Sequence, residues 1–274
     1  MLLKGKVAFI TGGSRGIGHA IAEAYLKEGA KVMLVARDRE ELKAAKEDLK
    51  KLGEVESCPA DVSRSGDVKA AVEAALHVFG RIDVLVNGAG IYGPIGPSEE
   101  VDFDKWKNTF EVNVFGTFRV MQEVIPHMKS QKSGKIINFS GGGDGPLARF
   151  SAYHASKGAI VRLTETIADE VKEYGIEVNC FAPGAVNTKF LDEALAAGEE
   201  KVGKDRYAKL LKQKAEGGVP PEKAAALCVF LASDASNGLS GKFLSAVWDE
   251  YPKWGPKEIA ETMKTDQFTL RRKV

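Results

Sequence analysis

The N-terminal segment constrains the fold most strongly, because a β-branched run leads into a glycine-rich loop and then into an amphipathic stretch. A strand is expected at 6–11 and a helix at 17–27, and the loop between them reads Thr11-Gly12-Gly13-Ser14-Arg15-Gly16-Ile17-Gly18. A helix N-terminus offers free N–H groups and a partial positive charge to a pyrophosphate, and glycines let its oxygens approach the backbone. Since the loop follows the first strand and opens the first helix, it predicts a dinucleotide-binding turn rather than a purely structural one.

The remainder of the chain repeats this alternation of short apolar runs and longer amphipathic stretches. Further strands are expected at 31–36, 55–59, 82–87, 135–140, 177–182 and 242–247, and further helices at 40–51, 66–78, 104–129, 152–174 and 221–232. Runs that are nearly continuous in Val, Ile, Leu and Phe are typical of parallel strands covered on both faces. The alternation therefore predicts an α/β fold with right-handed crossovers, in which a doubly wound parallel sheet lies between two helical layers.

The chain is expected to form one dinucleotide-binding catalytic domain over 1–247, because no repeat, charge block or Ser/Pro linker divides it. Two regions interrupt the alternation. A charged helical insertion at 188–218 is expected on the substrate side, and 248–274 forms a C-terminal extension that carries Trp248 and Trp254. We expect this extension to pack on its own domain or on a neighbouring subunit, and the alternative is that part of it covers the substrate cleft.

Composition argues against several classes of function. Lys and Arg number 39 against 38 Asp and Glu, which argues against nucleic acid as the main partner. The longest apolar run, 224–232, is much shorter than the ~20 residues of a membrane span, and the N-terminus lacks the apolar region of a signal peptide. Cys58, Cys180 and Cys228 lie far apart without histidines at ligand spacing, so we expect buried thiols and no metal site. The sequence thus predicts a soluble cytoplasmic protein that acts on a small molecule.

Several motifs follow the TGxxxGxG loop in a fixed order. They are Asp61-Val62 after the third strand, Asn87-Gly88-Ala89-Gly90 after the fourth, Asn113 in the fourth helix, Tyr153-xxx-Lys157 opening the fifth helix, and Pro183-Gly184-Ala185-Val186-Asn187-Thr188 after the sixth strand. With these motifs, the sequence from 6 to about 247 resembles the single-domain short-chain dehydrogenases/reductases. The resemblance implies a Rossmann fold, a nicotinamide cofactor, and hydride transfer between a ketone or aldehyde and an alcohol.

The resemblance also implies which residues bind the cofactor. Asp61 and Val62 would contact the adenine, although a turn or helix cap is the alternative role of Asp61. The other expected contacts are Gly12, Ser14, Arg15, Gly16, Ile17 and Gly18 of the loop, then Asn87, Ala89, Gly90, Tyr153, Lys157, Pro183, Gly184, Val186 and Thr188.

The end of the second strand indicates which nicotinamide cofactor is used. In NAD-using relatives an acidic residue at this point binds the ribose hydroxyls, and here that position is Ala36, followed by Arg37. A guanidinium offers paired donors to a 2′-phosphate, and Arg15 in the loop is a second cation. We therefore expect NADP. In the alternative interpretation both arginines are ordinary surface charges, Asp38 binds the ribose, and the cofactor is NAD.

Hydride transfer to a carbonyl carbon requires a group that supplies or removes the oxygen's proton. The phenol of Tyr153 has an ordinary pKa of ~10, and Lys157 lies one helical turn away on the same face, where its ammonium would stabilise the phenolate. By resemblance, Lys157 also holds the nicotinamide ribose. Asn113 would kink its helix and free a carbonyl that holds a water on the proton path, and a satisfied core amide is the alternative.

The substrate-orienting serine is where the sequence departs from the family. Counting forward along the strand places this position at Gly141, whereas counting back from Tyr153 places it at Ser140. We take Ser140 as the candidate, with the absence of any such serine as the alternative. The Asp-Gly-Gly motif that the family carries after its last strand is also missing, and residues 245–250 stand in its place. The sequence therefore does not predict which residues form the C-terminal wall of the cleft.

Two further expectations concern function and assembly. The intact Tyr153 and Lys157 favour an enzyme over a dinucleotide-binding regulator that has lost catalysis, and the glycine spacing disfavours an isomerase or dehydratase. The helices at 104–129 and 152–174 carry apolar residues on more than one side, so we expect a homo-oligomer, a tetramer or a dimer. The residues concerned are Val112, Val114, Phe115, Phe118, Val120, Met121, Ile160, Val161, Leu163 and Ile167.

Overall fold

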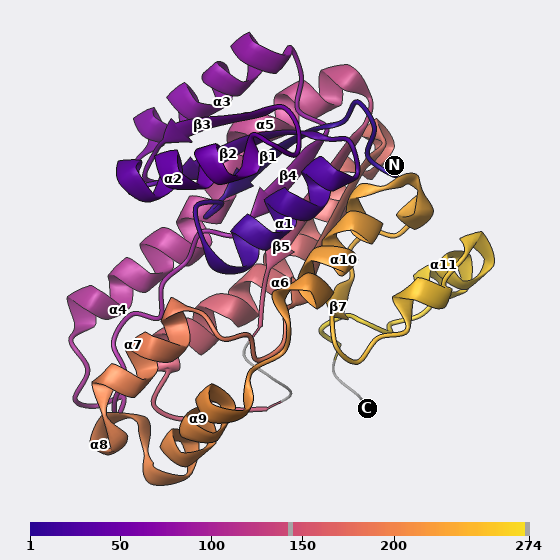
Figure 1. Ribbon diagram of the computed structural model, residues 1–274. Helices are drawn as coiled ribbons and strands as arrows, with labels where there is room; N and C mark the ends of the chain where they lie inside the picture. Colours follow the sequence, from indigo (N-terminus) through magenta and orange to yellow (C-terminus); the bar gives the residue numbers. More distant parts are fainter. Residues whose placement is uncertain (142–144, 272–274) are drawn as a thin grey trace.

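In the computed structural model, which describes residues 1–141 and 145–271, one parallel sheet lies between two layers of helices (Figure 1). The described strands form a seven-stranded sheet with the order β3-β2-β1-β4-β5-β6-β7. They are β1 (Val7–Thr11), β2 (Lys31–Ala36), β3 (Val55–Pro59), β4 (Val84–Asn87), β5 (Gly134–Phe139), β6 (Ile176–Ala182) and β7 (Phe243–Ser245). The predicted three-layer, doubly wound fold is therefore confirmed.

Helices cover both faces of the sheet, and each face has its own apolar core. On one face α1 (Gly16–Lys27), α2 (Arg39–Leu49) and α10 (Pro221–Ala232) pack together, and on the other lie α3 (Ser65–Phe79), α5 (Thr117–Gln131) and α6 (Ser151–Val171). This double coverage explains why the strands are almost uninterrupted apolar runs.

The strand order reverses between β1 and β4, which start crossovers in opposite directions. In open α/β sheets, a crevice for ligands forms at this reversal, beyond the carboxyl ends of the strands. The register aligns Thr11 of β1 with Asn87 of β4, and Asn87 with Asn138 of β5. The polar ends of three neighbouring strands therefore meet at the edge where the predicted loops lie.

The helix expected at 104–129 is divided. The chain forms α4 (Phe103–Phe110), a π-helical segment at Glu111–Gly116 and then α5. Single π-helical turns widen a helix and often lie at functional sites. This segment contains Asn113, at the position where the family resemblance implied a kink.

The predicted insertion at 188–218 contains three helices, α7 (Lys189–Ala197), α8 (Glu199–Val202) and α9 (Lys204–Glu216). Figure 1 shows them together at one end of the molecule, next to α4. They form a small apolar cluster of their own, in which Leu191 and Leu210 pack with Phe150 from the loop before α6.

The C-terminal extension packs along its own domain at the β7 edge. After α11 (Pro256–Met263) the chain returns to β7, where the Phe243 N–H donates to the Phe268 carbonyl at 2.8 Å. The Lys242 ammonium donates to the carbonyls of Thr265 and Gln267 at 2.9 and 3.0 Å. Farther along, the Leu270 N–H donates to the Glu165 carboxylate of α6 at 2.7 Å. We call this returning segment, 264–271, the strap.

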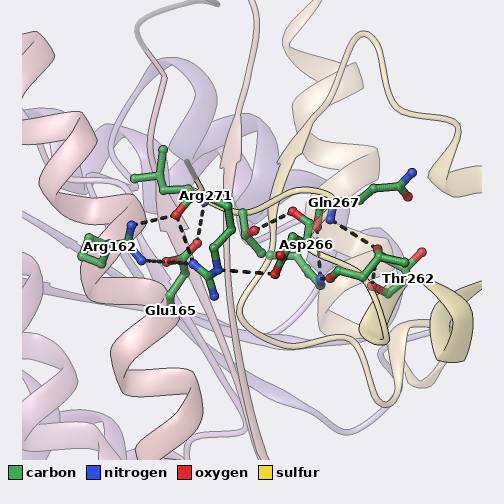
Figure 2. Close-up of polar contacts among 10 residues, drawn as sticks. Arg162, Glu165, Thr262, Asp266, Gln267 and Arg271 are labelled. Atoms are coloured by element: carbon green, nitrogen blue, oxygen red, sulfur yellow. Dashed lines mark hydrogen bonds and ion pairs between the residues drawn. The ribbon is translucent and has the colours of Figure 1, made fainter. Parts of the chain in front are cut away.

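Charged contacts hold the end of the strap on α6 (Figure 2). Arg162 donates to the Leu270 carbonyl at 2.7 Å, and Arg271 lies 3.1 Å from the Glu165 carboxylate and 3.4 Å from that of Asp266. Glu165 is therefore the central anion, since Arg162, Arg271 and the Leu270 N–H all converge on it.

The apolar residues that suggested an oligomer are mostly buried within the chain itself. Six of them, Val112, Val120, Met121, Ile160, Val161 and Ile167, are buried, because α5 and α6 pack on the sheet with these side chains inward. The large exposed members of the set are Phe115 and Phe118, at 49% and 40%. The apolar excess on these helices is therefore smaller than the sequence pattern indicated.

Candidate active site

The glycine loop packs too closely against its neighbours to accept side chains at two positions. A Cβ on Gly12, where φ is +68°, would lie 2.7 Å from the Gly88 carbonyl oxygen, and one on Gly18 would lie 2.2 Å from the Gly12 carbonyl oxygen. The Thr11 hydroxyl joins the loop to the next strand by accepting from the N–H groups of Gly88 and Ala89 at 3.1 and 3.2 Å. These contacts fix the loop so that the N-terminus of α1 opens at the crevice.

The residues around this loop fit a dinucleotide. Asn87 is buried and donates from Nδ2 to Asn138 at 2.9 Å, while its Oδ1 has no hydrogen-bond partner among the described residues. Buried polar atoms normally have partners, so an unpaired oxygen at the crevice indicates a place where a bound molecule donates. Thr188 lies on the opposite side, where a Cβ on Gly16 would come within 3.5 Å of its methyl group. The loops after β1, β4 and β6 thus form one cradle.

The loop after β6 contributes through its backbone shape. Gly184 has a φ of +85°, and a Cβ there would lie 2.6 Å from a methyl group of Val247. Val186 is nearly buried two residues later. Gly184 therefore allows the sharp turn that brings the segment from Pro183 to Thr188 over the glycine loop.

The arginines expected at the adenosine end both lie beside carboxylates. Arg15 donates to Glu41 of α2 at 2.6 Å, and Arg37 lies 4.0 Å from Asp61. Asp38, the alternative ribose ligand, caps α2 by accepting from the N–H groups of Glu40 and Glu41, each at 3.0 Å. Glu41 was missed from the sequence, because nothing in its spacing indicates that α2 carries it to the loop.

Asp61 forms a turn as well as facing Arg37. Its carboxylate accepts from the N–H and hydroxyl of Ser63 at 2.9 and 2.7 Å. Burial raises the pKa of Asp61, but these hydrogen bonds and Arg37 outweigh burial, so the net shift of the pKa is downward. The carboxylate is therefore held ionised at the place where the family resemblance expects the adenine.

Tyr153 and Lys157 lie one turn apart at the start of α6. The Lys157 ammonium is buried and donates to the Phe139 carbonyl at the end of β5, at 2.8 Å. It lies 5.6 Å from the centre of the Tyr153 ring. A Cβ on Gly90 would be 3.9 Å from the ammonium nitrogen, so the loop after β4 closes over it.

Asn113 connects this pair to the loop after β4. Its side chain accepts from the Ile91 N–H and donates to the Ile91 carbonyl and to the Ser156 hydroxyl, each at 2.9 Å. Its main-chain carbonyl accepts from the Thr117 hydroxyl at 2.8 Å. The amide is satisfied, and its carbonyl keeps a second lone pair for a further donor.

Burial shifts the pKa values of both central groups toward their neutral forms. It lowers the pKa of Lys157 to about 8 and, together with the nearby Tyr92, raises the pKa of Tyr153 well above its ordinary value. Desolvation disfavours any isolated charge, so both shifts have the same cause. Burial therefore disfavours ionisation of Tyr153, and a positive charge near its ring would counter this effect.

The two possible positions of the orienting serine differ clearly in geometry. Ser140 is buried, and its hydroxyl donates to the Lys157 carbonyl at 3.1 Å. By contrast, a Cβ on Gly141 would lie 3.6 Å from the Tyr153 hydroxyl oxygen. This geometry favours the forward count, in which glycine occupies the position facing Tyr153.

Aromatic side chains line the approach to Tyr153. The rings of Tyr92 and Tyr153 lie edge to face with centroids 4.7 Å apart, and Phe150 and Phe190 lie 5.3 and 4.6 Å from Tyr92. Tyr92 and Phe150 were missed from the sequence. Their positions, two residues after Gly90 and three before Tyr153, are the signals that could have indicated them.

Two further features of the described part of the chain bear on other classes of site. Over 1–141 and 145–271 there is no group of three or more His, Cys, Asp or Glu placed to hold a metal ion. Within the same ranges, no helix is both long and apolar enough to cross a membrane.

Comparison with known proteins gives concordant matches. The family model for short chain dehydrogenases matches residues 6–198. L-fucose dehydrogenase of Oryctolagus cuniculus is 36% identical over 85% of this chain and 80% of its own length. 3beta-hydroxysteroid dehydrogenase 1 of Eggerthella lenta is 36% identical over 88% and 92%. The crystal structure of NAD+-bound xylitol dehydrogenase superposes with a TM-score of 0.82 at 30% identity, covering 89% of this chain and 98% of that one. The chain therefore belongs to the short-chain dehydrogenase/reductase family of oxidoreductases.

Proposed function

We propose that this protein is an NADP-dependent oxidoreductase that interconverts a ketone or aldehyde and the corresponding alcohol. The observation that carries the proposal is the pairing of Tyr153 with a buried Lys157 on one turn of α6, beside the cradle formed by the loops after β1, β4 and β6. The cofactor would supply the hydride and, in its oxidised form, a positive charge.

In this proposal Tyr153 handles the proton. In the reductive direction its hydroxyl donates a proton to the carbonyl oxygen while the carbonyl carbon accepts a hydride, so the C=O bond becomes H–C–O–H. Lys157 lies close enough to stabilise the resulting phenolate, with its ammonium nitrogen 5.6 Å from the ring centre. Charge near the ring is needed because burial alone raises the pKa of Tyr153.

Asn113 is assigned a positioning role. Its side chain ties the π-helical segment to Ile91 and Ser156, and its main-chain carbonyl retains a lone pair that a water on the path to Lys157 could use. We assign no catalytic role to Ser140, because its hydroxyl already donates a hydrogen bond to the Lys157 carbonyl.

The preference for NADP is supported by the end of β2. Ala36 leaves no carboxylate at the strand end, Arg37 follows it, and Arg15 lies in the glycine loop. Xylitol dehydrogenase was crystallised with NAD+. NAD is therefore the alternative cofactor, and a direct comparison of NADPH and NADH binding separates the two.

The substrate is proposed to present an apolar face beside the reacting carbon. Tyr92, Phe150 and Phe190 surround Tyr153 on the side of α7–α9, and aromatic faces pack against the C–H surfaces of rings and chains. The three proteins named above are, by their names, dehydrogenases of L-fucose, of a 3beta-hydroxysteroid and of xylitol. This range agrees with an aromatic wall that does not itself require a charged substrate.

We further propose that residues 1–247 form the catalytic domain and that 248–274 is an extension packed on it. The chain is proposed to act in the cytoplasm as a homo-oligomer, a tetramer or a dimer, through the surface of α4, the π-helical segment and α5 that exposes Phe103, Phe115 and Phe118. Light scattering at micromolar concentration tests this, and a monomer would contradict it.

The decisive experiment measures net oxidation of NADPH by the purified protein against a panel of ketones and aldehydes. Tyr153→Phe should abolish turnover and leave NADPH binding within a few-fold of wild type. A regulator without catalysis would bind NADPH and turn over no carbonyl. An isomerase or dehydratase would convert its substrate without net change in NADPH.

A further inference from the structure

Glu41 contacts the glycine loop from a different element. It lies in the first turn of α2, and its carboxylate accepts from Arg15 at 2.6 Å and from the Ser14 hydroxyl at 3.4 Å. The Glu41 and Arg15 side chains are 36% and 47% exposed, so solvent and ligands can reach the pair. One acidic side chain thus occupies two donors of the loop.

These donors are of the kind that a phosphate monoester would use. A carboxylate and a phosphate both present anionic oxygens to a guanidinium fork and a hydroxyl. Arg37, the other cation at this end, lies 4.0 Å from Asp61. The two arginines therefore face two carboxylates, and the charge available to a 2′-phosphate is lower than the sequence alone indicated.

We infer that Glu41 sets the ratio of NADP to NAD affinity by competing with the 2′-phosphate for Arg15 and Ser14. The inference rests on the proposed nicotinamide-cofactor function, but not on which cofactor the wild type prefers. A cofactor without the 2′-phosphate has a neutral hydroxyl at that point, which competes poorly with a carboxylate for a guanidinium. Glu41 therefore weakens NADP binding selectively, through a contact to be broken and through repulsion between like charges.

The test is isothermal titration of the purified, cofactor-free full chain with NADPH and with NADH. Glu41→Gln keeps the size of the side chain and removes its charge. It should tighten NADPH binding about tenfold, which corresponds to ~1.4 kcal/mol, and change NADH binding less than twofold. Glu40→Gln is the matched control, because Glu40 carries the same charge on the same turn of α2 but makes no side-chain contact with the loop among the described residues.

A second variant shows whether Arg15 transmits the effect. In an Arg15→Ala background, the gain in the NADPH-to-NADH ratio from Glu41→Gln should be several-fold smaller than in wild type, because only the Ser14 contact and the charge repulsion remain. An equal gain in both backgrounds, an equal gain from Glu40→Gln, or weaker NADPH binding by Glu41→Gln would each overturn the inference. Weaker binding would mean that Glu41 positions Arg15 for the phosphate.

The same titrations separate this inference from the proposed function. If wild type binds NADH more tightly than NADPH, the NADP assignment fails. The change in the NADPH-to-NADH affinity ratio on Glu41→Gln still tests whether Glu41 competes with the 2′-phosphate. If neither cofactor binds, the oxidoreductase proposal and the inference both fail.

Discussion

Replacing Lys157 by Met should stabilise the cofactor-free protein while abolishing turnover. The ammonium is buried, and its pKa is lowered from 10.5 to about 8, so the folded state disfavours its charge. At pH 7 the charge then costs about 3 kcal/mol of folding free energy. Methionine fills a similar volume without charge. The loss is the hydrogen bond from the charged ammonium to the Phe139 carbonyl, worth about 2 kcal/mol. The net gain expected at pH 7 is about 1 kcal/mol.

The pH dependence identifies the cause. Below about pH 8 Lys157 is charged in both states and the full cost is present. Between about 8 and 10.5 the folded chain has lost this proton and the unfolded chain retains it, so wild-type stability relative to the variant rises with pH. The two stabilities should converge at about pH 9, where about 2 kcal/mol of the cost remains and offsets the hydrogen bond.

The assay is equilibrium denaturant unfolding of both proteins from pH 6 to 10 without cofactor. Lys209→Met is a suitable control, because Lys209 is exposed on α9 and its loss should leave stability within ~0.5 kcal/mol at every pH. A Lys157→Met variant less stable than wild type at pH 7, or a difference that does not change with pH, would refute the reasoning. Either result would mean that the buried ammonium is better compensated than its surroundings indicate.

Three further predictions test other parts of the site and the strap. Gly141→Ala should lower kcat at least tenfold in the NADPH assay, because its methyl would lie 3.6 Å from the Tyr153 hydroxyl oxygen and φ there is +124°. Ser140→Ala should keep kcat within a few-fold of wild type and lower the unfolding midpoint. A large loss of kcat in Ser140→Ala with little loss in Gly141→Ala would instead identify Ser140 as the orienting group. Arg37→Ala should weaken NADPH binding about tenfold, or ~1.4 kcal/mol, with NADH binding little changed, and equal losses for both cofactors in titration would contradict a phosphate contact. Glu165→Gln should speed limited proteolysis within the strap, because Arg162, Arg271 and Leu270 all meet that carboxylate, and an unchanged cleavage rate would show that the charge is dispensable.

Much of the fold was predictable, because its elements are local patterns. The strands at 31–36 and 55–59 and the helix at 221–232 have the bounds that the sequence indicated, and the ends of the other predicted elements differ by at most three residues. The glycine loop and the Tyr153–Lys157 pair were also recognisable, since each lies within one strand–loop–helix junction or one helical turn.

What could not be predicted depends on contacts between distant elements. The carboxylates that hold Arg15 and Arg37 come from α2 and from the loop after β3. The two ways of counting to the orienting serine lead to Ser140 and to Gly141, and spacing along the sequence does not decide between these neighbours. The share of the apolar surface of α5 that stays exposed could not be predicted either, because the sequence does not show how completely the sheet and α3 cover that helix.

The strap has a consequence for the behaviour of the chain outside its active site. β7 is the last strand of the sheet, and its outward N–H groups at Phe243 and Ser245 are taken by the Phe268 carbonyl at 2.8 Å and the Asp249 carboxylate at 2.6 Å. An edge strand with free donors is a template on which another chain can add a strand. The C-terminal extension therefore covers the edge of the sheet and prevents another chain from pairing with β7. A protein truncated before residue 264 should self-associate through the backbone donors of β7, even though its catalytic residues remain in place.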